Sequence, residues 1–206
     1  MEGPRPTVKP FLGMPDTAQG TIPELLSQTG AYADLLSLRP ATGIIPYELA
    51  LPFWSDGAVK LRLAAIPGQV KFSEQGEWQF PPGSVFIKTF EMPVDASRPQ
   101  VTRRLETRLL VVDRTGGVYG VSYKWRADLS DADLVAPSGI DEALTVSVAN
   151  HRTQQQVWSY PGREDCLVCH NSHTRGVLGP KTRQLNIVMR YPDGRVENQL
   201  RRWNRW

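Results

Sequence analysis

Thiols and imidazoles are scarce in this chain, which has two cysteines and three histidines among its 206 residues. Two cysteines cannot form the several disulfide bonds that hold small secreted scaffolds together. The sequence also lacks a run of about eighteen apolar residues, so it predicts no membrane span. The net charge is only +3, and the basic residues are scattered until the end of the chain, which argues against a nucleic-acid-binding protein.

What the chain does have is an ordinary share of apolar residues, 40%, together with 17 glycines and 17 prolines. Its length and composition are those of a globular protein that can bury a hydrophobic core without disulfide bonds or structural metals. Residues 1–20 are rich in proline and glycine, and they predict a flexible linker. Thr21 and Glu24 have the spacing of a capping box, which predicts a short N-terminal helix ending before Gly30.

After Gly30 the periodicity indicates β-strands. Large apolar residues alternate with small or polar ones from Tyr119 to Trp125, and the loop 113–117 connects this strand to another over 105–112. Further strands are predicted over 85–90 and over 144–148, the latter with a return through residues 157 and 158. We therefore predict a mainly β fold, an antiparallel sandwich or barrel-like sheet over residues 21–160.

The most distinctive stretch is Cys166-Leu167-Val168-Cys169-His170. Two cysteines at this spacing with a histidine directly after them are typical of covalent haem attachment, with both sulfurs as thioethers and the imidazole as proximal iron ligand. We therefore predict one covalent haem c, held by Cys166, Cys169 and His170. Residues 161–206 are the predicted haem-attachment segment, packed on the β-rich domain.

Three other interpretations of the motif remain open. A zinc site needs four well-separated ligands, and His151 and His173 do not supply a second pair at finger-like spacing. A thioredoxin-type redox pair belongs between a strand and a helix in a βαβ setting, whereas residues 158–163 indicate a strand followed by a loop. Coincidence is the third interpretation.

Met189 is the only methionine after the motif, and it is the candidate for the second axial iron ligand. The competing interpretation is that it fills space in an apolar strand. His151, in a predicted hairpin tip, is expected in solvent. His173, three residues past His170, is expected either in solvent or in contact with a haem propionate. Three cations near the motif are candidate donors for the haem propionates: Arg175, Lys181 and Arg183.

Several other stretches are distinctive in combination: Ile45-Pro46-Tyr47, Phe53-Trp54-Ser55-Asp56-Gly57-Ala58-Val59-Lys60, Trp78-Gln79-Phe80-Pro81, Ile87-Lys88-Thr89-Phe90, Leu105-Glu106-Thr107-Arg108-Leu109, Ser122-Tyr123-Lys124-Trp125, Leu178-Gly179-Pro180, Gln184-Leu185-Asn186 and Asn198-Gln199-Leu200. With them the chain resembles, over most of residues 22–200, a family of bacterial exported proteins that carry a haem c motif late in a β-rich domain. Members accompany, or are fused to, quinoprotein sugar dehydrogenase-like modules or cytochrome c domains. The resemblance implies haem binding and electron transfer.

The expected location is the periplasm or another extracytoplasmic compartment, because haem is normally attached there. Residues 1–10 nevertheless show no apolar segment of a signal peptide, so we expect an excised domain or a start placed too late. The function we predict is a c-type cytochrome domain that relays single electrons from a redox partner such as a quinoprotein dehydrogenase or a cytochrome. The alternatives are a non-haem β-sandwich module for protein or carbohydrate binding, and a haem enzyme of the peroxidase type.

Overall fold

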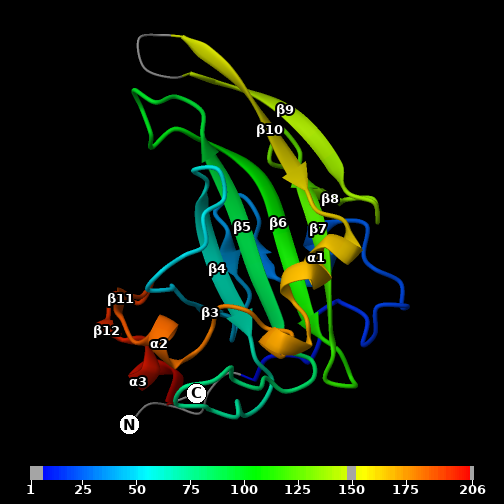
Figure 1. The fold of residues 1–206 in the computed structure, drawn as a ribbon, viewed down its shortest axis with the longest axis vertical. Helices are drawn as coiled ribbons and strands as arrows, with labels where there is room; N and C mark the ends of the chain where they lie inside the picture. Colours follow the sequence, from blue (N-terminus) through cyan, green and yellow to red (C-terminus); the bar gives the residue numbers. More distant parts are fainter. Residues whose placement is uncertain (1–6, 148–151, 205–206) are drawn as a thin grey trace.

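A computed structural model describes residues 7–147 and 152–204, and it confirms the predicted mainly β, antiparallel fold (Figure 1). Its centre is a six-stranded sheet in which each strand is antiparallel to its neighbours. The strands follow one another in the sheet in chain order: β3 (Ile45–Pro46), β4 (Val59–Ala65), β5 (Val85–Pro93), β6 (Thr102–Val112), β7 (Val118–Trp125) and β8 (Ala132–Leu134).

Three two-stranded sheets accompany the central one: β1 (Tyr32–Asp34) with β2 (Arg39–Pro40), β9 (Ile140–Ser147) with β10 (Thr153–Tyr160), and β11 (Val188–Arg190) with β12 (Val196–Asn198). The strands predicted over 85–90, 105–112 and 119–125 form, and the loop 113–117 joins β6 to β7 as predicted. The strand predicted over 144–148 forms as far as Ser147, where the described part of β9 ends, and its predicted return through residues 157 and 158 is β10. The hairpin of β9 and β10 extends beyond the end of the central sheet (Figure 1). The tip that carries His151 lies outside the described residues.

One face of the central sheet is apolar and is covered by the N-terminal part of the chain. Leu63, Ile87, Leu109 and Val121 lie side by side on four strands of this face and are almost fully buried. The residues packed on them from the N-terminal part include Val8, Leu12, Met14, Ile22 and Leu26. Residues 7–20 are therefore core-forming, which corrects the predicted linker: their prolines and glycines shape turns that carry apolar side chains onto the sheet.

A short helix precedes Gly30, as predicted, but it begins later than the sequence suggested. It is the 3₁₀ helix η1 (Leu26–Thr29), and Gly30 ends it in the left-handed conformation with φ 70°. The predicted capping box of Thr21 and Glu24 is not used. Instead the backbone NH of Leu25 donates to Oε1 of Gln28 at 3.1 Å, which satisfies one of the donors exposed at the helix start.

The opposite face of the sheet carries the C-terminal segment. It contains α1 (Arg163–Cys169), η3 (Ser172–Thr174), α2 (Thr182–Leu185) and α3 (Gln199–Asn204). Leu185 of α2 and Trp203 of α3 are buried in an apolar cluster on this face, where Trp203 contacts Tyr47 and Trp78 edge to face. In the part of the chain that is described, no helix is both long and apolar enough to cross a membrane.

Candidate haem-attachment site

The motif lies on α1 and the turn that follows it. Gly162 precedes the helix and passes so close to Pro137 that a Cβ there would lie 2.3 Å from the Pro137 carbonyl oxygen. The Asp165 carboxylate accepts from the Gly162 NH at 2.9 Å, and acidic residues in a first turn also suit the positive end of the helix dipole. The helix ends where the His170 NH donates to the Cys166 carbonyl at 3.0 Å. This local structure holds both cysteines and the histidine on one and a half turns.

Helix α1 lies against strand β7 (Figure 1). Gly120 of β7 makes the close approach possible. A Cβ at Gly120 would lie 2.6 Å from Sγ of Cys166, which is nearer than atoms can approach. The φ angle of Gly120 is ordinary, so space alone requires glycine here. The sheet thus has a recess for the first sulfur of the motif.

The two cysteines differ in exposure and form no disulfide. Cys166 is half-buried, its Sγ lies 3.4 Å from the Gly162 carbonyl, and burial raises the pKa of its thiol. Cys169 is exposed. A redox-active pair of the thioredoxin type depends on a thiolate with a lowered pKa, so the environment of Cys166 argues against that interpretation.

His170 is held by a backbone carbonyl. Its Nδ1 lies 2.8 Å from the carbonyl oxygen of Gly176, and because a carbonyl can only accept, Nδ1 carries the proton. The lone pair is therefore on Nε2, which makes no hydrogen bond within the described residues. Burial lowers the pKa of the ring; the hydrogen bond to Gly176 opposes this shift, and the nearby charges of Lys88 and Arg108 add to it. A neutral imidazole oriented through its other nitrogen is the form in which histidine binds a metal.

Both cysteines and His170 line one cavity of about 350 Å³ between α1, the sheet and residues 47–55. Its walls are partly apolar, with Leu49, Phe86, Leu110, Val177 and Leu178. They also include three cations of the sheet, Arg62, Lys88 and Arg108. A larger hollow of about 640 Å³ also touches His170, but neither cysteine lines it, so the smaller cavity is the candidate site.

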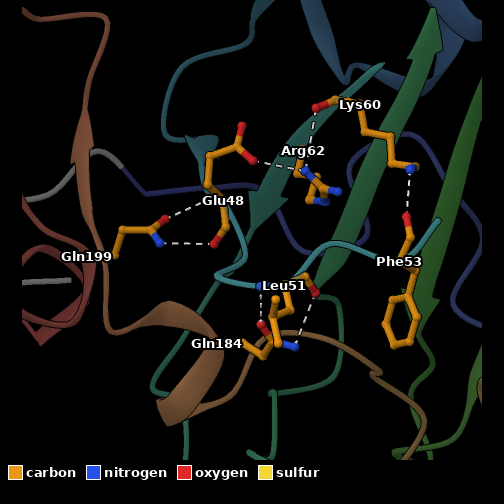
Figure 2. Close-up of polar contacts among 7 residues, drawn as sticks. All are labelled: Glu48, Leu51, Phe53, Lys60, Arg62, Gln184 and Gln199. Atoms are coloured by element: carbon orange, nitrogen blue, oxygen red, sulfur yellow. Dashed lines mark hydrogen bonds and ion pairs between the residues drawn. The ribbon is translucent and has the colours of Figure 1, made fainter. Parts of the chain in front are cut away.

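Residues 48–53 form one side of this cavity, and long side chains hold them by their backbone (Figure 2). The Gln199 amide accepts from the Glu48 NH at 2.8 Å and donates to the Glu48 carbonyl at 2.9 Å. Gln184 forms the same kind of pair with Leu51, at 2.9 and 3.3 Å. Lys60 Nζ donates to the Phe53 carbonyl at 2.6 Å. The C-terminal segment thus fixes this side of the cavity as well as supplying the motif.

The structure does not bring Met189 to the cavity. Met189 lies partly buried on β11, in the small sheet with β12, and does not line the cavity. His173 is exposed on η3, as expected.

The cations predicted near the motif also lie elsewhere. Lys181 pairs with Glu77, Arg183 is exposed, and Arg175 borders the larger hollow instead. The cations of the cavity come from the sheet, where sequence analysis did not place them. The signal that points to them is the position of charged residues inside otherwise apolar strands, such as Arg62 in β4 and Lys88 in β5.

Within residues 7–147 and 152–204, no three histidine, cysteine, aspartate or glutamate side chains gather to hold a metal ion. A four-ligand zinc site of such residues is therefore not formed by the described chain. Comparison with protein-family models, with curated proteins and with solved structures finds no match to this chain.

Proposed function

We propose that this protein is a c-type cytochrome domain that carries one covalent haem and relays single electrons. The observation that carries the proposal is the cavity that both cysteines and His170 line together. Sequence proximity alone gives two candidate attachment cysteines and one candidate iron ligand, whereas a shared cavity gives a place for a flat, largely apolar ring beside them.

The residues present fit a haem. Gly120 leaves room for the Cys166 sulfur, and the hydrogen bond from Nδ1 of His170 to Gly176 leaves Nε2 for iron. Each thiol would add across one vinyl group, with its hydrogen passing to the neighbouring carbon, so the attachment needs no oxidant. Cys166 and Cys169 would hold the ring, and His170 would be the proximal ligand.

The haem iron, when bound, supplies one-electron oxidation and reduction. The protein's own residues do the rest: Leu49, Phe86 and Leu110 limit water at the ring, and the three sheet cations place positive charge in the cavity. Burial and nearby charge are two of the means by which proteins set a haem potential. No residue is required to make or break a substrate bond. The electron donor we propose is a quinoprotein dehydrogenase or another cytochrome outside the cytoplasmic membrane.

The experiment is expression with an export signal and the haem-attachment machinery, followed by a denaturing gel stained for haem. We expect the wild-type band to retain colour and the C166A/C169A double variant to lose it. A colourless wild-type band would overturn the proposal and favour a β-sandwich module for protein or carbohydrate binding.

Reduced spectra with and without carbon monoxide separate a carrier from an enzyme. A carrier with both axial positions filled should show little change, because carbon monoxide needs an open iron position. A rapid and complete shift would instead indicate an open site of the peroxidase type.

A further inference from the structure

Three cations form a row across the cavity side of the central sheet. Arg62 on β4 pairs in register with Lys88 on β5, and Lys88 pairs in register with Arg108 on β6. Residues paired in this way point to the same face, and neighbouring strands lie about 4.8 Å apart. All three side chains line the cavity of the two cysteines and His170.

The carboxylates near the row do not neutralise it. Glu48 accepts from Arg62 Nη1 at 2.9 Å (Figure 2), and Glu106 accepts two hydrogen bonds from Arg108 at 2.8 and 2.9 Å. Lys88, in the middle, has no ion pair or hydrogen bond to any described residue. Asp165 also lines the cavity, but its carboxylate accepts from the Gly162 NH and not from Lys88. Among the described residues, Lys88 thus stands between two cations without a carboxylate of its own, and like charges side by side on a sheet are destabilising.

Arg62 shows a second sign of a missing partner. Its side chain is only 4% exposed, and its Nε is buried without a hydrogen-bond partner in the described chain. A buried donor without an acceptor is costly, and native proteins rarely leave one. Burial, together with Arg108 and Arg62, also lowers the pKa of Lys88 to about 8, as expected where a cation lacks an anion.

We propose that the row of Arg62, Lys88 and Arg108 binds the propionate carboxylates of the haem. This inference rests on the proposed function and adds the part of the site that orients the ring. Carboxylates supply the missing negative charge, and guanidinium groups bind them through paired hydrogen bonds.

The first test uses the haem-loaded protein and the variants Lys88→Gln and Lys88→Arg. Lys88→Gln removes a positive charge that disfavours the oxidised iron, so the midpoint potential should fall where the propionate stays ionised. The propionate that has lost its cation also ionises less readily, so the potential should become pH-dependent near neutrality. Lys88→Arg should restore the wild-type behaviour. The control is Lys124→Gln, because Lys124 lies on the same sheet but pairs with Glu142 and does not line the cavity.

The second test measures binding of free haem and of its dimethyl ester to the C166A/C169A variant by absorbance titration. The ester has the same ring without the charges. We expect the free acid to bind at least about tenfold more tightly, since hydrogen bonds to charged groups contribute that much or more. Adding Arg62→Gln and Lys88→Gln should remove this preference.

The outcomes separate the two proposals. A colourless wild-type protein overturns both the proposed cytochrome function and the proposal that the row binds haem propionates. If the protein is coloured but Lys88→Gln changes neither the midpoint potential, nor its pH dependence, nor the preference for free haem over the dimethyl ester, only the propionate-binding proposal is overturned. A changed iron spin state in Lys88→Gln that Lys88→Arg does not restore also overturns it, because the lysine amine would then be an iron ligand.

Discussion

The two faces of the central sheet differ in whether their buried polar side chains have hydrogen-bond or ion-pair partners. On the face covered by the N-terminal part, the polar side chains satisfy one another: Tyr32 and Thr89 are 2.8 Å apart, Thr89 and Thr107 2.6 Å, and Trp125 donates to Thr107 at 2.9 Å. On the cavity face, Arg62 Nε has no partner and Lys88 has no counter-ion among the described residues. Among the described residues, the polar groups named on the first face have partners, whereas Arg62 Nε on the second face has none.

We interpret the difference as one between a face that stabilises the fold and a face that binds a ligand. The apolar face provides stability, since burial of apolar surface is the main favourable term in folding. If the proposed function is correct, the cavity face gives up part of that stability to hold groups that bind the haem, as binding sites commonly do. The following predictions test this comparison.

Leu109→Ala on the apolar face should have the largest effect on stability. Leu109 is 1% exposed within the main core, so the variant should lower the free energy of unfolding by about 2–5 kcal/mol. Urea denaturation measures this change. The haem spectrum of the protein that still folds should be unchanged, and a shifted spectrum would contradict the division between the faces.

Gly120→Ala should disturb the cavity face. The new Cβ would lie 2.6 Å from Cys166 Sγ, so α1 must move away from β7, at a cost of about 1–3 kcal/mol. The fraction of protein with covalent haem, measured by in-gel stain against total protein, should fall. In the matched control, Gly68→Ala, the Cβ meets Pro81 at an ordinary 3.6 Å, and stability should change by less than about 0.5 kcal/mol. Equal haem content in both variants would contradict the claim that haem attachment needs the space that Gly120 leaves for the Cys166 sulfur.

Gln199→Ala should loosen the side of the cavity formed by residues 48–53. Gln199 is fully buried and pairs with both backbone polar groups of Glu48, so its loss should cost about 1–3 kcal/mol in urea denaturation. Gln155→Ala is the control, because Gln155 is exposed and its side chain bonds, among the described residues, the Thr145 hydroxyl alone. An equal loss in both variants would mean that the pairing with Glu48 contributes little.

Lys88→Met should have the smallest effect and the opposite sign. In the haem-free C166A/C169A background it removes an uncompensated charge, so stability should rise by about 0.5–2 kcal/mol at pH 7. A clear loss of stability at pH 7 would show that the lysine charge is already compensated in the haem-free protein.

The same lysine should make the stability of the haem-free protein depend on pH. Burial and the charges of Arg108, Arg62 and Lys60, opposed by Glu106, lower its folded pKa from 10.5 to about 8. Between those values the unfolded chain holds a proton that the folded chain has lost, so stability should rise with pH from about 8 to 10.5. Lys88→Met should lack this rise. The same slope in both proteins would show that Lys88 titrates normally.

Sequence patterns predicted the strands that alternate clearly, such as Tyr119 to Trp125, because periodicity is a local signal. They did not predict β4, although Val59, Leu61 and Leu63 alternate there with Lys60 and Arg62, so a local signal for this strand was present. The core role of residues 7–20 also escaped prediction, because a segment rich in proline and glycine gives no local sign of what its few apolar side chains contact.

At the candidate site, the three motif residues could be proposed from spacing alone. The row of cations could not, because the alignment of Arg62, Lys88 and Arg108 depends on the register of three strands separated in the sequence. The same limit applied to Met189: being the only methionine after the motif says nothing about which sheet it joins.

The most direct test of the account is peptide mass spectrometry of the exported, matured protein after treatment with a thiol-alkylating reagent. The account predicts that the peptide containing Cys166 and Cys169 carries the mass of one haem and that neither cysteine reacts with the reagent. Recovery of that peptide with both cysteines alkylated and no added mass would contradict it.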